Sequence, residues 1–222
     1  TTITNNEGEY ALNDIVIGKY RLVFEHSDKH FYDAEREVTV EEEKTTIVDM
    51  VMEKIKGTIS GKTTPGNVEI YIGGEIVATS DNDGNYKIEE LLPGEYTLTY
   101  RKNNYIEKTL TVAVHPGINT PNTNITLDPK PGTVTGRVMG RGSNIQNAVI
   151  RIDGKGTRTG NDGTFTVNNI TPNIPLTLEV SADSYEDKII DNIIICPGEN
   201  KDLGDIELIA RASERGNIKG VV

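Results

Sequence analysis

The sequence predicts an all-β fold made of several small antiparallel β-sandwiches in tandem, the first of them incomplete. Two observations support this prediction. Short runs rich in Val, Ile, Thr and Tyr alternate with clusters of Gly, Pro, Asn and Asp along the whole chain, a pattern typical of short strands and tight turns. Two short phrases also recur at nearly regular intervals, which indicates repeated structural units.

The first phrase is a polar turn with glycine, followed by an aromatic residue and then by a strand. Its three copies are residues 6–10 with 18–20, residues 82–86 with 94–96, and residues 161–165 with Leu176. We expect Asp83 with Gly84, and Asp162 with Gly163, to form tight hairpin turns, because glycine adopts a positive φ at little cost.

The second phrase, an apolar residue followed by x-Gly-x and another apolar residue, opens each unit. Its copies are residues 55–59, 134–138 and 218–222. The first unit has no such opening, and the last opening has no unit behind it. The predicted division is a partial sandwich at 1–54, sandwiches at 55–130 and 131–210, and at 211–222 a linker with the first strand of a further sandwich.

The central unit shows the expected strands best. They are residues 55–60, 68–72, 76–80, 85–89, 95–101, 105–114 and 123–127. Apolar residues alternate with polar ones along 95–101, so one set faces inward. The inward residues are Tyr96, Leu98 and Tyr100, with Leu176, Leu178 and Val180 in the next unit and Tyr20, Leu22 and Phe24 in the first.

The central unit carries G-T-I at 57–59, D-G-N-Y at 83–86 and L-P-G-E-Y-T-L at 92–98, with Tyr105 behind them. These motifs resemble the carboxypeptidase regulatory-like domain. The resemblance implies seven-stranded antiparallel Greek-key sandwiches of the transthyretin-like (prealbumin-like) or immunoglobulin-like type. It covers essentially the whole chain, although residues 171–176 lack the Pro-Gly and the Tyr. Such domains form repeated stalks of bacterial and archaeal surface proteins, stand beside enzymes and occur in adhesins.

The related collagen-adhesin B-type domains can form an internal Lys–Asn isopeptide bond with the help of a buried Glu. The positions that correspond to this Glu are Phe24, Tyr100 and Val180. Glu25 and Glu179 lie one residue away, and a shift of one residue moves a side chain to the other face of a strand. The sequence therefore argues against this cross-link.

Composition excludes several function classes. The 222 residues carry a formal net charge of −11, which argues against binding to nucleic acid or to anionic lipid. No run of 18 apolar residues is present, so we expect no membrane insertion of this segment. The one cysteine, Cys196, is expected to be a buried small apolar residue at a strand end, the alternatives being a reactive thiol or an intermolecular bridge.

Few residues suggest chemistry. His26, His30 and His115 have no metal-ligand spacing, and no nucleophile motif is present, so we expect no enzyme. Asp81, Asp83 and Asn85 form an oxygen-rich turn that could bind calcium as a cofactor, but Asp and Asn also cap their own backbone in ordinary turns.

The sequence therefore indicates a non-enzymatic structural repeat segment of an extracellular or cell-surface stalk or fibre. Its partners would be other copies of itself or neighbouring modules of a longer chain. Strand donation by Ile218, Lys219, Gly220, Val221 and Val222 could join copies head to tail, while a cut piece of a longer protein explains the same incomplete first unit. The alternative function is an adhesin, or a module that binds a glycan or a host protein, with or without calcium.

Overall fold

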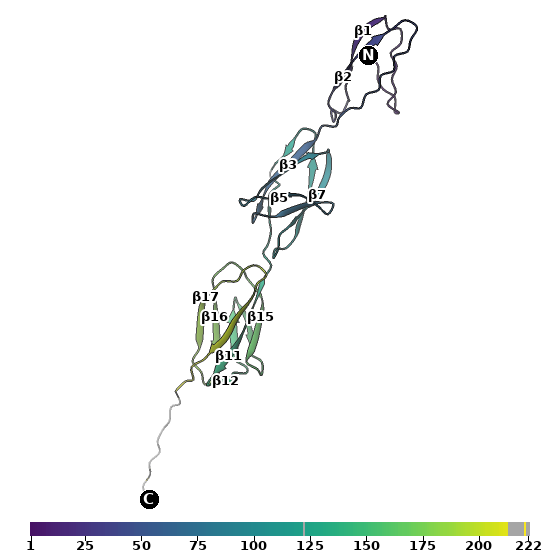
Figure 1. Cartoon of the computed structure of the whole chain (residues 1–222). Coiled ribbons are helices and arrows are strands. Elements are labelled where there is room, and N and C mark those ends of the chain that lie inside the picture. Colours follow the sequence, from purple (N-terminus) through teal and green to yellow (C-terminus); the bar gives the residue numbers. More distant parts are fainter. Residues whose placement is uncertain (122, 213–219, 221–222) are drawn as a thin grey trace. The chain divides into compact units, whose positions relative to one another are not determined.

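Every regular element in the described part of the chain is a β-strand, which confirms the predicted fold class (Figure 1). The computed structural model describes residues 1–121, 123–212 and 220. Two compact units are present, one formed by Thr1–Thr99 with Thr109–Ile125 and the other by Tyr100–Lys108 with Thr126–Val222. Within the described residues, no helix could cross a membrane.

The strands from Gly132 to Glu207 form a sandwich of two sheets. The strands are β11 (Gly132–Gly140), β12 (Ser143–Asn144), β13 (Val149–Ile152), β14 (Lys155–Arg158), β15 (Thr164–Ile170), β16 (Leu176–Ser181), β17 (Lys188–Ile193) and β18 (Asn200–Glu207). One sheet has the order β12-β11-β15, with β18 on β11, and the other has the order β14-β13-β16-β17. Side chains that alternate along the strands fill the space between the sheets, including Val134, Val138, Leu178 and Ile195.

The first and last strands of this sandwich are parallel neighbours. β18 pairs with β11 from Thr133↔Asn200 to Met139↔Glu207, with a bulge between Thr135 and Arg137. All other strand pairs of the sandwich with a defined register are antiparallel. The opening strand β11 therefore lies between β15 and β18, and both neighbours depend on it for their hydrogen bonds.

Residues 55–130 repeat this arrangement. The strands are β3 (Gly57–Thr64), β4 (Glu69–Ile72), β5 (Glu75–Thr79), β6 (Asn85–Leu91), β7 (Gly94–Arg101), β8 (Lys108–Val114), β9 (Asn119–Thr120) and β10 (Ile125–Thr126). One sheet has the order β10-β3-β6, with β9 also on β3, and the other has the order β5-β4-β7-β8. The expected inward residues Leu98 and Tyr100 are buried, as are Leu178 and Val180 in β16.

Strand pairing corrects the alignment of the opening phrase. Gly61 faces Tyr86 across β3 and β6, and Gly136 faces Phe165 across β11 and β15. Gly61 is therefore the counterpart of Gly136, whereas the sequence comparison matched Gly57 to it. The error arose because a similar phrase begins four residues earlier in β3 and because β11 is extended by the short hairpin to β12.

Residues 1–54 contain only two strands, β1 (Gly18–Phe24) and β2 (Ala34–Val40), paired antiparallel. They correspond to β7 and β8, as the order of the repeated phrases shows. None of these 54 residues is fully buried. The expected inward face is present, since Leu22 and Phe24 are half-buried, but Tyr20 is exposed because no second layer covers it.

The glycine turns differ from the predicted hairpins. Asp83 and Gly84 connect β5 in one sheet to β6 in the other, so they form a crossover turn instead of a hairpin. In each of the three segments the turn glycine donates its N–H to the carbonyl three residues earlier, at Asn5, Asp81 and Gly160. The turn that does form a two-residue hairpin is Gly73 with Gly74, between β4 and β5, and both have positive φ.

Two of these glycines allow a matched test of close packing. Gly84 and Gly74 have nearly the same φ, +90° and +94°. A Cβ on Gly84 would lie 2.0 Å from the Thr63 carbonyl oxygen, whereas a Cβ on Gly74 would have no heavy atom beyond its chain neighbours within 4 Å. We expect Gly74→Ala to cost about 1–2 kcal/mol of unfolding free energy from backbone strain alone. Gly84→Ala should cost more than about 3 kcal/mol, because the backbone of β3 must also move.

Calorimetric melting of the full chain carrying each substitution measures this difference in the transition that the substitution shifts. Equal losses for the two variants would show that the contact between Gly84 and Thr63 does not limit the packing of the turn.

Candidate functional site

The open side of the 1–54 segment is the main candidate surface. Its half-buried apolar side chains include Tyr10, Leu22, Phe24 and Val38. Tyr10 and Phe24 contact each other edge to face, with ring centroids 5.7 Å apart. Their counterparts in the central segment, Tyr86, Leu98, Tyr100 and Val112, are at most 6% exposed. The difference is the covering strands, which residues 1–54 do not supply.

The central segment shows which strand would cover this face. In the central segment β3 lies between β6 and the closing strands β9 and β10. The counterparts of these neighbours in the first segment, residues 10–15 and 45–51, form no strand. A strand needs a partner to hydrogen-bond its backbone groups. Without a middle strand between them, residues 10–15 and 45–51 have no such partner, which explains why neither stretch forms a strand.

We call the position between residues 10–15 and residues 45–51 the slot, and one tyrosine hydrogen bond crosses it. The Tyr10 hydroxyl donates to the Val48 carbonyl at 2.8 Å, from residues 10–15 to residues 45–51. The Tyr86 hydroxyl likewise donates to the Thr123 carbonyl at 2.7 Å. In the central segment this bond passes over Gly61, where a Cβ would lie 2.6 Å from the same Thr123 oxygen. The first segment thus keeps the crossing bond without the strand beneath it.

Large apolar side chains are exposed along the first segment. They are Ile3, Leu12, Ile15, Val16, Ile17, Tyr20, Val23, Tyr32, Ile47 and Val51. Contiguous exposed apolar surface marks interaction sites, whereas single exposed apolar side chains are ordinary in proteins. Sequence reasoning noticed the absent strands but not the slot, because only the pairing order shows which segments lose a partner.

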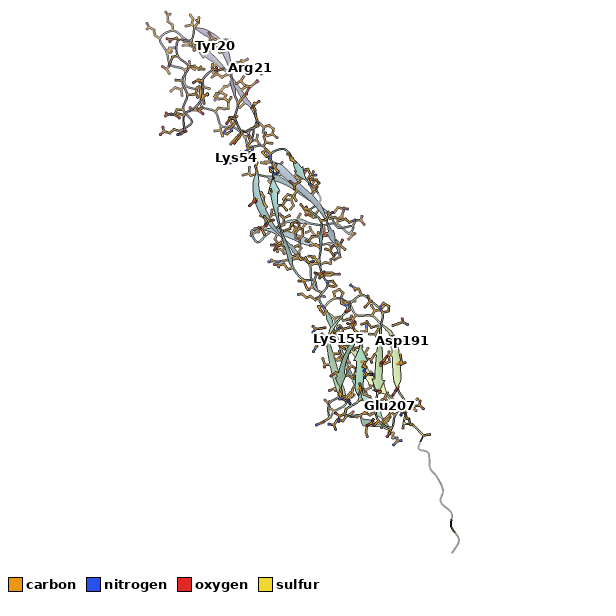
Figure 2. All side chains as sticks on the ribbon, turned by 180° about the vertical axis from the view of Figure 1, so that it is seen from behind. Tyr20, Arg21, Lys54, Lys155, Asp191 and Glu207 are labelled. Atoms are coloured by element: carbon orange, nitrogen blue, oxygen red, sulfur yellow. The ribbon has the colours of Figure 1, made fainter. Side chains whose placement is uncertain are left out.

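A backbone bridge recurs where the chain leaves each segment. Phe31 pairs with Lys54, Tyr105 with Pro129, and Tyr185 with Ala210, each as an isolated antiparallel bridge. Two N–H to carbonyl bonds of 2.8–2.9 Å form every bridge. Figure 2 labels Lys54 at the first of them. Tyr105, which the sequence motif places after L-P-G-E-Y-T-L, therefore has a role, since the bridge ties the exit of its segment to it. Phe31 and Tyr185 hold the same position in the other two segments.

The predicted calcium residues lie in the crossover turn. One carboxylate oxygen of Asp81, Oδ1, accepts the Asn85 backbone N–H at 2.7 Å, and the Asn85 amide donates to the other, Oδ2, at 3.1 Å. These bonds hold the pKa of the Asp81 carboxyl below its usual value, the side-chain bond from Asn85 being the largest cause. The turn therefore uses the oxygens of Asp81 itself, and binding of calcium by Asp81, Asp83 and Asn85 stays a prediction.

Other candidate groups are local contacts. His26 and His30 both pair with Asp28, at 2.5 and 3.4 Å, in the loop after β1. Among the described residues, no three His, Cys, Asp or Glu side chains are placed to hold a metal ion. A hollow of about 130 Å³ lies on β13, β16 and β17, lined by Arg151, Glu179 and Lys188 among others.

Two predicted positions need separate comment. Cys196 is exposed, so the expectation of a buried thiol was wrong. The alternation that buries Ile193 and Ile195 turns the next side chain outward. Of the predicted donor strand, Ile218, Lys219, Val221 and Val222 lie outside the described residues, and Gly220 is exposed and outside any strand.

The isopeptide positions agree with the sequence argument. Tyr100 and Val180 are buried and Phe24 is half-buried. The buried polar side chains in the described residues are Thr63, Ser80, Thr123 and Thr159. The described core therefore contains no Lys, Asn or Glu for an internal cross-link.

A family model matches residues 1–54, and its description is BOS complex subunit NOMO1-like, second β-sandwich domain. No curated protein matches the chain. Among solved structures, the Bacillus anthracis TIE protein is 18% identical with a TM-score of 0.51, and the match covers 93% of this chain and 44% of that protein. The chain therefore spans less than half of its length.

Two pilins also match. GBS52, the minor pilin of Streptococcus agalactiae, is 10% identical over 78% of this chain and 91% of its own, with a TM-score of 0.31. BcpA, the major pilin subunit of Bacillus cereus, is 10% identical over 92% of this chain and 89% of its own, with a TM-score of 0.36. At these TM-scores the two pilins support no conclusion about this chain.

The Asp81 turn predicts a pH dependence. Because the folded-state pKa of Asp81 is lowered, its contribution to stability is complete above the unfolded-state pKa of about 3.9 and is lost as the pH falls through the folded-state value. Asp81→Asn cannot titrate, so its melting temperature should fall less than that of the wild type between about pH 4 and pH 2. It should be lower than the wild type at pH 7.

Melting curves across this pH range check the expectation, with Asp83→Asn, the exposed neighbour in the same turn, as the control. If Asp81→Asn and the wild type lose the same melting temperature on acidification, the carboxylate does not stabilise the turn.

Proposed function

We propose that this chain is a non-enzymatic structural repeat segment of a larger extracellular or cell-surface protein, of the carboxypeptidase regulatory-like kind. The observation that carries the proposal is the recurrence of one scaffold in three successive segments. Each has the same glycine turn and the same exit bridge. In the described residues no cluster of reactive side chains recurs with this scaffold. Such a repeat suits a protein that spaces or displays other domains.

The proposed division is a partial module at 1–54, modules at 55–130 and 131–210, and at 211–222 a linker with an opening strand. The family match to residues 1–54 supports a sandwich for the first module. The partial module would then be completed by opening strands, which neighbouring modules of a longer chain or other copies of this chain could supply.

We further propose that the slot of the 1–54 segment accepts an opening strand of the type found at 218–222, donated head to tail by another copy. The phrase Ile218-Lys219-Gly220-Val221-Val222 has apolar residues and glycine where β11 has Val134, Gly136 and Val138. Glycine at the middle position is what this slot requires, because Tyr10 crosses it as Tyr86 crosses Gly61. Strand addition is an established mode of protein recognition.

Only one face of the donor strand should contact the 1–54 segment. In β11 the residues Val134 and Val138 are buried, so Ile218 and Val222 would enter the open face and Val221 would point away. We expect the full chain to associate in a concentration-dependent manner, and a chain ending at residue 210 to remain monomeric. Sedimentation velocity over a range of concentrations measures this.

Matched substitutions distinguish strand donation from nonspecific hydrophobic association. Val222→Asp should abolish association, whereas Val221→Asp, on the outward face, should keep it. If the full chain is monomeric at every concentration, head-to-tail donation is wrong. If both substitutions act alike, the contact is not a strand in this register.

The alternative function is an adhesin, or a module that binds a glycan or a host protein, with or without calcium. The exposed apolar side chains of residues 1–54 favour a protein ligand over a glycan within this alternative, since they offer aliphatic surface and no tryptophan. A monomeric chain whose apolar surface stays exposed in solution would favour this reading.

A further inference from the structure

We propose that residues 131–210 are the load-bearing part of this chain, because β11 and β18 form a shear clamp, and that residues 55–130 yield first under tension. Tension enters the C-terminal sandwich at Gly132, the start of β11. From the other side it passes the single bridge between Tyr185 and Ala210 and then reaches Glu207, the end of β18. Figure 2 labels Glu207 where β18 ends. This inference depends on strand direction and does not require the proposed function.

Parallel pairing of the first and last strands decides how the load acts. The start of β11 pairs with the start of β18, at Thr133↔Asn200. Tension pulls β11 at its N-terminal end and β18 at its C-terminal end, in opposite directions along the same axis. The two strands must therefore slide past each other. All the ladder bonds are loaded together, whereas a hairpin such as β16 and β17 opens one bond at a time from its end.

The clamp in the C-terminal sandwich is long and anchored. Its pairing extends from Thr133 to Met139, and further N–H to carbonyl bonds join Thr133 to Glu199 and Leu208 to Met139 at 2.8 Å each. The inward side chains of both strands belong to one core, with Val134 and Val138 from β11 and Ile206 from β18. Sliding would drag these buried groups through the packed interior, which is costly.

An ion pair fixes the register of the clamp. Arg137 and Asp205 are direct partners across β11 and β18, immediately after the bulge. The Arg137 Nε and Nη2 donate to the two Asp205 carboxylate oxygens at 2.7 and 3.0 Å. A bidentate pair has a narrow geometry, so a shift of one residue along the strands breaks both bonds.

The central segment lacks a continuous clamp. In the described residues its closing strand is divided into β9 and β10, two residues each. Both pair with β3, β9 at Thr58↔Asn119 and Ile59↔Thr120, and the described residues between them, 121, 123 and 124, lie outside any strand. Lys62 takes the position of Arg137, and its backbone N–H bonds to the Asn124 side chain at 2.8 Å. Fewer continuous ladder bonds share the load, so this segment should open at lower force.

Force spectroscopy on the full chain, held by handle proteins of known unfolding length at both ends, tests the proposal. We expect a low-force event and a high-force event. The high-force event should release about 75 residues, which extend to at most roughly 270 Å. Forced unfolding follows the unfolding rate, and Arg137→Ala should raise the rate of this event alone roughly two- to fivefold at a given force.

Control variants make the outcome decisive. The charge swap of Arg137→Asp with Asp205→Arg should restore the force that either single substitution lowers. Asp191→Ala removes a 2.7 Å bond from Thr177 between β16 and β17, outside the clamp, and should leave the force unchanged. Thermal melting shows that each variant is folded. The proposal is overturned if Arg137→Ala leaves the high-force event unchanged, or if Asp191→Ala lowers it equally.

Discussion

The fold of each segment depends on one strand that is paired on both sides. β3 and β11 each lie between a neighbour from the middle of the segment and its closing strand. Where this strand is present, both layers form and the core side chains are buried. In residues 1–54 it is absent, its two flanking stretches form no strand, and no residue is buried. Central pairing thus determines whether a second layer can form at all.

Glycine makes this central position possible. The opening strand passes beneath an aromatic ring or beneath the hydrogen bond of its hydroxyl. At this crossing there is no room for a side chain on the strand. A Cβ at Gly61 would lie within 3 Å of Thr123, and a Cβ at Gly136 within 3 Å of Phe165. The same requirement explains why the opening phrase recurs with glycine at its centre. It is a packing requirement, so its recurrence reports the fold and not a ligand.

Much of the fold could be predicted from sequence because alternation and turn residues are local signals. The strand around Leu98 was found in this way. The crossover at Gly84, the match of Gly61 to Gly136 and the exposed Cys196 could not, because they depend on which strand pairs with which. The slot beside Tyr10 could not be predicted for the same reason. The two stretches that would flank an absent strand cannot be recognised before the sheet order is known.

The central strand links two properties that are otherwise separate. A strand with both neighbours in one chain, as β11 has β15 and β18, carries load by shear and is hard to remove. A slot bounded by two unpaired stretches, as beside Tyr10, would under the proposed function bind such a strand from elsewhere through the same ladder bonds. Strength within a segment and association between segments would therefore follow from one geometry. A donated strand that fills the slot would sit, like β11, between two neighbours, so the joint would resist tension by the same parallel pairing.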